Sequence, residues 1–225
     1  MKVLVKSVIS LAVFLAGFQS NALCAEHYVI DASHTSIIFG ISHLGYSYTY
    51  GRFNNFKGNY VLNRANPAGS QFQLSISAAS IDTNDKQRDE HLKSPDFFNA
   101  KQFPGISFQS TGVSAQQTTN GIVYQVNGKF TMHGVSRGIT LPLKKLGEGK
   151  GPAGDYRTGF LCQTSLKRSD FGMNGMIPMI GNDVAITISF EGIRQGPTDA
   201  SGAVGQPAGE GSGSADKQGR SGVKQ

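Results

Sequence analysis

The chain has 225 residues, 29 of them Gly and none Trp, and a formal net charge of +6. This length is enough for one well-packed domain and little more. The remaining Lys and Arg are scattered once Lys2 and Lys6 are set aside, whereas nucleic-acid-binding proteins gather them on one face or helix. Composition therefore argues against a nucleic-acid-binding protein.

Residues 1–25 are predicted to be a signal peptide rather than part of the fold. Lys2 and Lys6 give a positive start, and the apolar run 8–18 is too short for a membrane span but right for a signal-peptide core. We therefore expect an exported, periplasmic protein. No later segment is apolar enough to span a bilayer, so transient membrane contact is the most that we expect.

Signal cleavage after Ala22 and after Ala25 both remain open, and the choice decides whether Cys24 survives in the mature protein. Lipid anchoring at Cys24 is a minor alternative, because Leu23 stands where a small residue is required. Cys162 lies in a strand-like run and is expected to be a small buried apolar residue.

Residues 26–194 are predicted to form the folded domain, and their main pattern has a period of two. Apolar Val184, Ile186 and Ile188 alternate with small or polar residues, so one side of each strand faces an apolar interior. The predicted strands lie near 27–32, 35–44, 48–63, 70–80, 105–114, 121–131, 137–146, 156–168 and 183–193.

Short turns between consecutive strands favour antiparallel neighbours, and only residues 84–94 are predicted to be helical. About eight strands in one domain indicate a closed barrel or a sandwich. The long strands near 48–63 and 156–168 favour the barrel, because tilted strands run further. We expect an all-β fold: a single antiparallel eight-stranded barrel with one short helix.

The composition changes at residues 195–225, where Gly, Ser, Ala, Pro and Gln dominate and no aromatic residue occurs. Such a segment buries too little apolar surface to offset its ordering entropy, so we expect a disordered tail without a second domain. Its role stays open.

The segment Gly134-Val135-Ser136-Arg137-Gly138 matches the Gly-x-Ser-x-Gly motif of serine hydrolases. That motif needs a strand, a sharp turn and a helix, but the next residues have a β pattern and contain Pro142. We interpret the segment as a turn between strands. The five His residues lack the tight spacing of known zinc sites, so no metal site is predicted.

Arg88, Asp89, Glu90 and His91 place an acid, a base and a cation together. An enzyme could use such groups for proton transfer. An exposed helical turn with internal salt bridges is a second reading, and a site for the head group of an amphipathic ligand is a third. The sequence does not rank the last two.

Phe is abundant, with 14 in the chain, and Met residues punctuate the Gly-rich segment 171–180. Met and Phe beside Gly can repack around variable hydrocarbon chains. A small barrel either fills its interior with side chains or leaves room for one ligand, and the pattern alone does not decide between them.

The chain resembles the YceI-like family of exported proteins with an extended lipocalin-like barrel, over about residues 27 to 193. Lys167 departs from the family pattern, which has a polar Asn before Arg168. The resemblance is carried by Asp31, His34, Ser36, Phe39, His43, Gly45, Gly51, Phe53, Phe56, Gly58, Ser80-Ile81-Asp82-Thr83, Arg88-Asp89-Glu90-His91-Leu92, Phe97-Phe98, Pro104, Ile106, Phe108, Gly128, Thr131, Arg168-Ser169-Asp170-Phe171-Gly172 and Val184.

The resemblance implies that the barrel binds a long apolar chain, such as a polyisoprenoid, an isoprenoid quinone or a fatty amide, without catalytic residues or a catalytic cofactor. We expect a periplasmic carrier, monomeric or homodimeric, that sequesters or transports one such lipid. The alternatives are an enzyme that acts on the lipid through Asp89 and His91, and a filled barrel serving as an interaction module. The ligand-binding candidates are Phe39, Phe53, Phe56, Arg88, His91, Phe97, Phe98, Phe103, Phe108, Phe171, Met173, Met176, Met179, His34 and His43.

Overall fold

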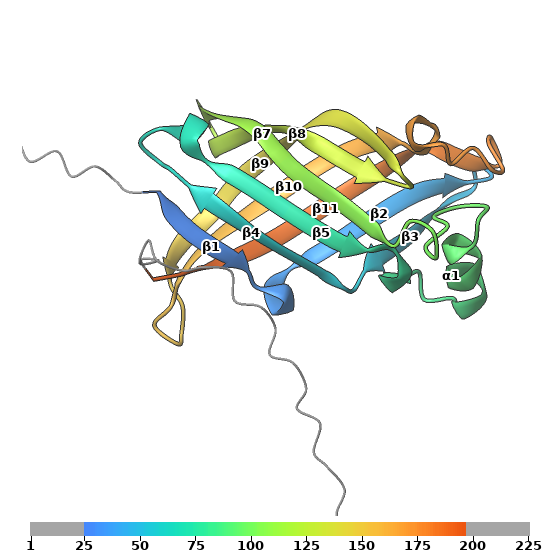
Figure 1. Cartoon of the computed structure of the whole chain (residues 1–225), viewed down its shortest axis with the longest axis horizontal. Helices are drawn as coiled ribbons and strands as arrows, with labels where there is room; N and C mark the ends of the chain where they lie inside the picture. Colours follow the sequence, from blue (N-terminus) through green and yellow to red (C-terminus); the bar gives the residue numbers. More distant parts are fainter. Residues whose placement is uncertain (1–24, 197–225) are drawn as a thin grey trace, which may run out of the picture. The chain divides into compact units, whose positions relative to one another are not determined.

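A single antiparallel sheet closes on itself to form a barrel in the computed structural model, which describes residues 25–196 (Figure 1). The barrel order is β1-β4-β5-β7-β8-β9-β10-β11, and β11 returns to β1. The predicted closed eight-stranded antiparallel barrel is therefore confirmed. The strands are β1 (Glu26–Ile30), β2 (Ser36–His43), β3 (Ser47–Phe53), β4 (Phe56–Leu62), β5 (Gln71–Ser77), β6 (Ile81–Asp82), β7 (Gly105–Thr118), β8 (Gly121–Met132), β9 (Val135–Lys150), β10 (Tyr156–Lys167) and β11 (Ile180–Arg194).

Three of the eight barrel strands are interrupted, and each is numbered as two segments: β1 and β2, β3 and β4, and β5 and β6. Eleven segments therefore build the barrel. The 3₁₀ turn Ala32–His34 separates β1 from β2, and Ala78–Ser80 separates β5 from β6. The predicted strand 48–63 is split into β3 and β4 at Asn54 and Asn55. Asn is a poor strand former. The side-chain amide of Asn54 donates a hydrogen bond to the Asp82 carboxylate (3.0 Å) at this break.

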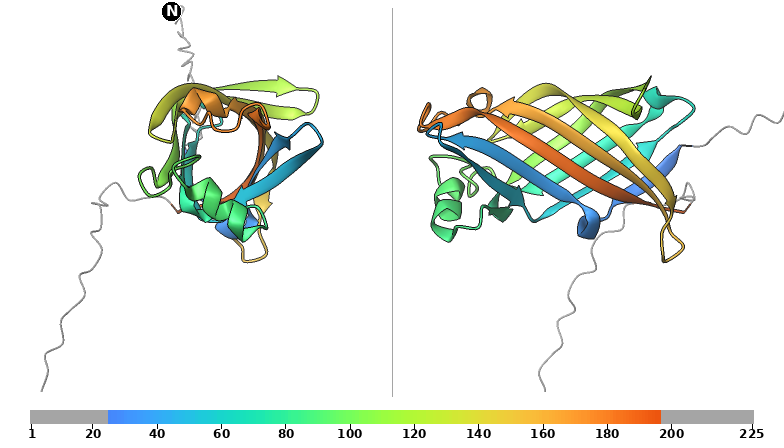
Figure 2. Two further views of the ribbon diagram at one scale, coloured as in Figure 1. Left: turned by 90° about the vertical axis from the view of Figure 1, so that its right-hand side faces the viewer. Right: turned by 180° about the vertical axis from the view of Figure 1, so that it is seen from behind.

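Helix α1 (Lys86–Lys93) is the one α-helix among the described residues and lies within the predicted segment 84–94. The side chain of Asp85 caps it by accepting from the backbone N–H of Arg88 (3.0 Å). Viewed end-on, the strands form a ring, and α1 lies at the rim of one opening (Figure 2). The helix therefore belongs to the entrance of the barrel.

The segment resembling a hydrolase motif is a tight hairpin between β8 and β9. His133 and Gly134 have φ values of 52° and 74°, the left-handed backbone that two-residue hairpin turns require. Ser136 lies in β9, and its hydroxyl shares a hydrogen bond with Thr131 (2.8 Å). The predicted turn between strands is confirmed.

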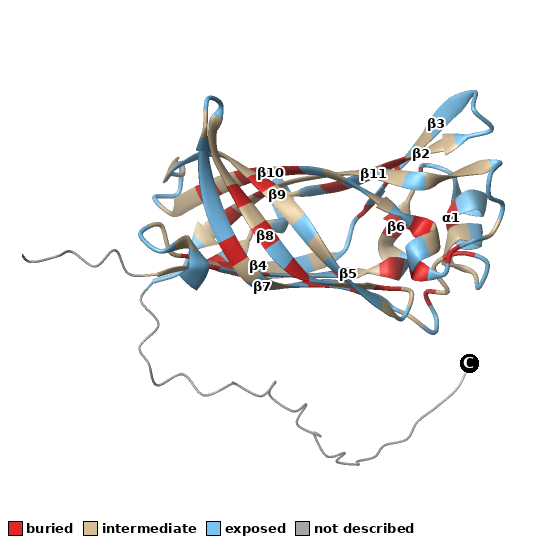
Figure 3. Ribbon diagram, turned by 90° about the horizontal axis from the view of Figure 1, so that it is seen from above, coloured by how far each residue is buried: buried red, intermediate tan, exposed pale blue. Residues whose placement is uncertain are grey.

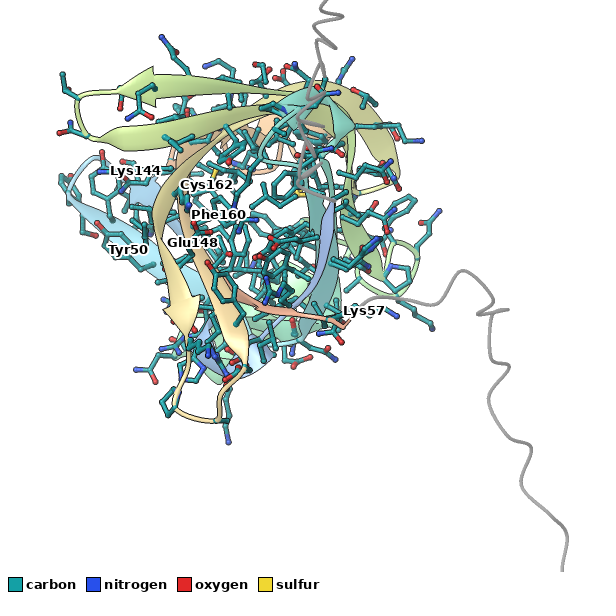
Figure 4. All side chains as sticks on the ribbon, turned by 90° about the vertical axis from the view of Figure 1, so that its left-hand side faces the viewer. Tyr50, Lys57, Lys144, Glu148, Phe160 and Cys162 are labelled. Carbon is teal, nitrogen blue, oxygen red and sulfur yellow. The ribbon has the colours of Figure 1, made fainter. Side chains whose placement is uncertain are left out.

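Aromatic side chains fill the end of the barrel remote from α1. Tyr28 stacks on Tyr60, which packs in turn against Phe72, Phe160 and Phe190. Phe160 points into the barrel at this end, among closely packed side chains (Figure 4). A Cβ atom at position 192 would overlap the Tyr60 ring, so Gly is required there. We call this layer, Tyr28, Tyr60, Phe72, Phe160 and Phe190, the aromatic plug.

Ion pairs cover the outer side of the plug. Arg64 pairs with Glu26 and with Glu148, and Arg194 pairs with Glu26 (2.8 Å). The hydroxyl of Tyr28 donates to Glu26 (2.8 Å). These contacts tie β1, β9 and β11 together across the end of the barrel, so the plug is held between apolar packing inside and paired charges outside.

Cys162 is fully buried beside the plug and is a free thiol. Burial raises the pKa of this thiol to about 11, so it stays protonated at neutral pH and acts as a small apolar residue, as predicted. Cys24, the expected signal peptide 1–25 apart from its last residue, and the expected tail from residue 197 onward lie outside the described residues. Between residues 25 and 196 no helix is long and apolar enough to cross a membrane.

Candidate ligand cavity

The half of the barrel next to α1 encloses a cavity of about 730 Å³. The barrel is thus filled at one end and hollow at the other, which answers the question that the pattern left open. Most of the cavity wall is apolar and comes from inward-facing positions of the strands. These include Ile37, Phe39, Ile41, Phe53, Ile76, Phe108, Phe130, Leu141, Ile186 and Ile188.

The alternation of the sequence places this wall. In β11, Val184, Ile186 and Ile188 line the cavity, and in β2, Ile37 and Phe39 face them from the neighbouring strand. Because successive strand residues point to opposite sides of a sheet, the apolar member of each pair reaches the interior. The wall is therefore a direct product of the period of two.

Polar groups gather where helix α1 meets the cavity. Asp85, Gln87, Arg88 and His91 line this entrance, which we call the mouth. Arg88 donates from Nε and Nη2 to the hydroxyl and carbonyl oxygens of Thr83 (both 2.8 Å), and it remains 42% exposed. Its Nη1 atom lies 4.0 Å from Asp85, so the guanidinium is held at the mouth beside one carboxylate.

Asp89 holds the helix on the barrel rather than serving as a free acid. Its Oδ1 atom accepts from the backbone N–H of Thr83 (2.8 Å) and from the Thr83 hydroxyl (2.6 Å), and the residue is buried. His91 shares a hydrogen bond with Asp96 (3.1 Å) and packs edge-on against Phe97. Asp89 and His91 are thus engaged in positioning the helix and the Phe pair after it.

Phe97 and Phe98 form the apolar side of the mouth. Phe97 is 6% exposed, and Phe98 meets Phe53 edge-on with ring centroids 5.7 Å apart. Both rings line the cavity. They lie between the polar groups of α1 and the apolar strands, where a hydrocarbon chain would pass from water into the barrel.

Arg168 lines the cavity as well, and it is absent from the sequence-based candidates. It is 4% exposed and donates to three backbone carbonyls, those of Gly181 (2.8 Å), Met173 (2.9 Å) and Ile180 (3.0 Å). Its guanidinium carbon lies 5.9 Å from the Phe97 ring. Burial lowers the pKa of this guanidinium, since desolvation disfavours its charge.

Residues 28–192 match the family model of the YceI-like domain. The chain belongs to the YceI-like family. A UPF0312 protein of Pseudomonas paraeruginosa is 39% identical over 84% of this chain and 98% of its own length. A UPF0312 protein of Pectobacterium atrosepticum is 36% identical over the same shares.

Solved structures share the fold. BcnA of Burkholderia cenocepacia has a TM-score of 0.64 at 23% identity and matches 72% of this chain and 98% of its own. The YceI protein of Campylobacter jejuni has a TM-score of 0.60 at 27% identity, covering 69% and 90% of the two chains. A domain of Saccharophagus degradans, described as polyisoprenoid-binding, has a TM-score of 0.57 at 16% identity, covering 75% and 98%.

Within this YceI-like barrel, ten of the fifteen predicted site residues come together around one cavity. They come from β2, β3, α1, β7 and the loops that follow α1 and β10. They are Phe39, His43, Phe53, Arg88, His91, Phe97, Phe98, Phe108, Met173 and Met176. Whether they contact a ligand stays a prediction.

The other five candidates lie outside the cavity lining. Phe56 and Phe171 pack in the core beside it. Phe103 packs edge-on against His133 (4.9 Å), and Met179 is 51% exposed in the loop before β11. His34 bonds Asp31 (2.7 Å) at the 3₁₀ turn between β1 and β2. Composition and spacing did not separate these residues from the ten that line the cavity.

The His34 site also bears on metal binding, because Asp31, His34 and Glu191 bring three possible ligand atoms together. The Nη1 atom of Arg157 lies 2.6 Å from Asp31 and 3.0 Å from Glu191. The Arg157 guanidinium thus already occupies an oxygen of each carboxylate, and its positive charge opposes a metal cation at the same place. Hydrogen bonds from Ser33, His34 and Arg157 hold the pKa of Asp31 well below its usual range.

Proposed function

We propose that this protein binds one long-chain isoprenoid-type lipid, a polyprenyl chain or an isoprenoid quinone, and sequesters or transports it in the periplasm. The observation that carries the proposal is the apolar cavity of about 730 Å³, with a plug at one end and a polar mouth at the other. Binding sites for small molecules commonly measure roughly 300–1,000 Å³ and are mainly apolar with a few polar groups.

The orientation of the bound lipid follows from the difference between the two ends of the cavity. The hydrocarbon tail lies in the strand-lined interior and points toward the plug, while the head group stays near Arg88 and His91 at the mouth. Each buried CH₂ group contributes about 0.8 kcal/mol, so a chain of roughly ten buried carbons already gives useful affinity. The Met residues, Met173 and Met176, adapt the wall to chains of different shape.

One structural neighbour supports a lipid ligand. The Saccharophagus degradans domain that shares this fold is described as polyisoprenoid-binding. The expected signal peptide supports a periplasmic location. A bound lipid is the only non-protein component in this proposal.

A binding role fits the mouth better than an enzymatic one. Asp89 is occupied by two hydrogen bonds from Thr83, and His91 bonds Asp96. An acid–base catalyst needs a group within reach of the reacting atoms and free to exchange its proton. We therefore propose a lipid-binding protein rather than an enzyme acting on the lipid.

Native mass spectrometry of the purified mature protein, followed by organic extraction, tests the proposal. We expect a stoichiometric adduct that yields a prenyl lipid or quinone, or an empty protein that takes up one added prenyl lipid. The matched control is Phe103→Ala, which lies outside the cavity lining and should keep the adduct. An empty protein that refuses added prenyl lipids and quinones would overturn the proposal.

A further inference from the structure

Exposed apolar side chains are concentrated at the mouth of the barrel. Ten large hydrophobic side chains are exposed among residues 25–196, and only Val29 and Leu146 lie far from the β2–β3 hairpin and the loop before β11. Seven of them form what we call the apolar rim, namely Leu44, Tyr46, Tyr48, Tyr50, Met176, Ile177 and Met179. An apolar patch of this kind on a folded domain marks an interaction site.

The rim is built from two segments that touch. The backbone N–H of Leu44, in the β2–β3 turn, donates to the carbonyl of Met179 (2.7 Å), and Ile180 pairs with His43. Figure 3 shows the β2–β3 hairpin projecting from the barrel, with much of its surface exposed. Met176 is 45% exposed and also lines the cavity, so the rim continues directly into the cavity wall.

The tyrosines dominate the outer side of this hairpin. Tyr46, Tyr48 and Tyr50 are 89%, 63% and 65% exposed, and the Tyr48 and Tyr50 rings lie 6.4 Å apart. Tyrosine has an apolar ring and a polar hydroxyl, and it gathers where hydrocarbon meets water at membrane surfaces. Exposed Tyr beside exposed Leu and Met suits that interface, where aromatic residues lie at the level of the head groups and aliphatic residues lie deeper.

The charges of the rim match a bilayer surface. Neither residues 36–53 nor residues 171–182 contain Asp or Glu, while Arg52 and His43 lie in the first segment. Bacterial phospholipid surfaces are negatively charged and repel carboxylates. The rim residues therefore add no negative charge, and the carboxylates of the neighbouring mouth, Asp85, Glu90 and Asp96, each lie beside a basic partner, Arg88, Lys93 and His91 respectively.

We propose that the apolar rim docks the barrel, mouth first, on the surface of a phospholipid bilayer. Leu44, Tyr46 and the Met176–Met179 loop insert among the acyl chains, while Tyr48 and Tyr50 lie at the depth of the head groups. The cavity then opens onto the membrane, and a hydrocarbon chain can pass into the barrel without crossing water. This docking goes beyond the identity of the ligand and does not depend on it.

The chain contains no Trp, so a single introduced Trp reports on one position. In the full mature protein, Tyr46→Trp places it on the rim, and Leu146→Trp places a matched control at the other, plugged end. Extruded vesicles of phosphatidylethanolamine and phosphatidylglycerol are the probe. We expect a blue shift of the Trp emission for Tyr46→Trp and none for Leu146→Trp. Equal shifts, or no shift at position 46, would overturn the proposal.

Flotation with the same vesicles gives an independent measurement. The triple variant Leu44→Ser, Tyr46→Ser, Met179→Ser should lower the bound fraction at least about tenfold. The control, Val29→Ser with Leu146→Ser, removes exposed apolar groups elsewhere and should float like the wild type. The proposal would be overturned in favour of self-association if the wild-type protein stays unbound to vesicles and forms dimers, and the triple variant is monomeric.

Discussion

The rings of Tyr28 and Tyr60 lie stacked, with centroids 4.7 Å apart and planes inclined by 8°. This pair joins β1 to β4 within the aromatic plug, which fills the barrel beyond the cavity. The hydroxyl of Tyr60 also donates to the carbonyl of Thr158 on β10 (3.2 Å). The plug therefore has both apolar packing and a directional bond across the barrel.

Shortening the plug should deepen the cavity at a cost in stability. Phe160 is fully buried and packs against Tyr60, Phe72, Tyr124 and Phe190. We expect Phe160→Ala to lower the free energy of unfolding by about 3–5 kcal/mol, as for other buried Phe residues. Urea denaturation measures this loss, and competition between prenols of different length should show a shift toward longer chains. An unchanged length preference would mean that the plug does not limit the chain.

Removing the Phe pair at the mouth should weaken lipid retention. Phe97→Ala with Phe98→Ala exposes the passage between α1 and the strands, so the protein should lose bound lipid faster. The measurement is dissociation of a bound prenyl lipid followed by native mass spectrometry. Phe103→Ala is the matched control, because Phe103 packs against His133 outside the cavity lining. Equal retention in both variants would show that Phe97 and Phe98 do not contribute to lipid binding.

Replacing the buried Arg168 should cost more stability than replacing the half-exposed Arg88. Arg168→Met leaves one buried and two partly buried carbonyl groups without their donor, and an unpaired buried group costs about 1–3 kcal/mol. We expect a loss on the order of 3 kcal/mol in urea denaturation. Arg88→Gln, at the half-exposed Arg of the mouth, should cost less than about 1 kcal/mol. A comparable loss of stability in both variants would contradict the view that the three hydrogen bonds of Arg168 stabilise the connection between β10 and β11.

High pH should destabilise the barrel through the plug. Burial raises the pKa of Tyr60 far above its usual value, so Tyr60 ionises in the unfolded chain before it does so in the folded one. Its contribution is complete below about pH 10 and is lost as pH rises further, by at most about 1.4 kcal/mol per pH unit. Thermal unfolding between about pH 8 and pH 11 measures the slope.

The matched variant for the pH series is Tyr60→Phe. It keeps the ring in the plug and removes the group that ionises, so the alkaline slope should become shallower. Burial also raises the pKa of Tyr28, of Tyr124 and of the Cys162 thiol, which leaves part of the slope in place. A slope identical to that of the wild type would assign the alkaline sensitivity to other groups.

Much of the fold was predictable because it depends on local patterns. The alternation of Val184, Ile186 and Ile188 predicted an inward-facing wall, and the structure places all three on the cavity. The segment 84–94 was predicted to be the short helix, and α1 lies inside it with Asp85 as its N-cap. Both patterns depend on neighbouring residues, so they can be read from the chain.

The extent of the cavity was not predictable for a physical reason. Alternation tells which side chains point inward, but not how far each ring reaches across the barrel. Phe108 lines the cavity, Phe171 is buried in the core beside it, and Phe160 belongs to the plug. Arg168 was missed as a lining residue because an Arg after a strand normally faces water. Its carbonyl partners are Met173, in the loop after β10, and Ile180 and Gly181, at the start of β11, and the pattern does not bring these to Arg168.

The plug has a kinetic consequence for the exchange of ligands. A chain that enters a tube closed at its far end travels tail first and leaves head first, so a second chain cannot displace it from behind. Replacement must then wait for the first occupant to depart. The rate of exchange would be set by spontaneous release alone, and raising the concentration of the competitor would leave that rate unchanged.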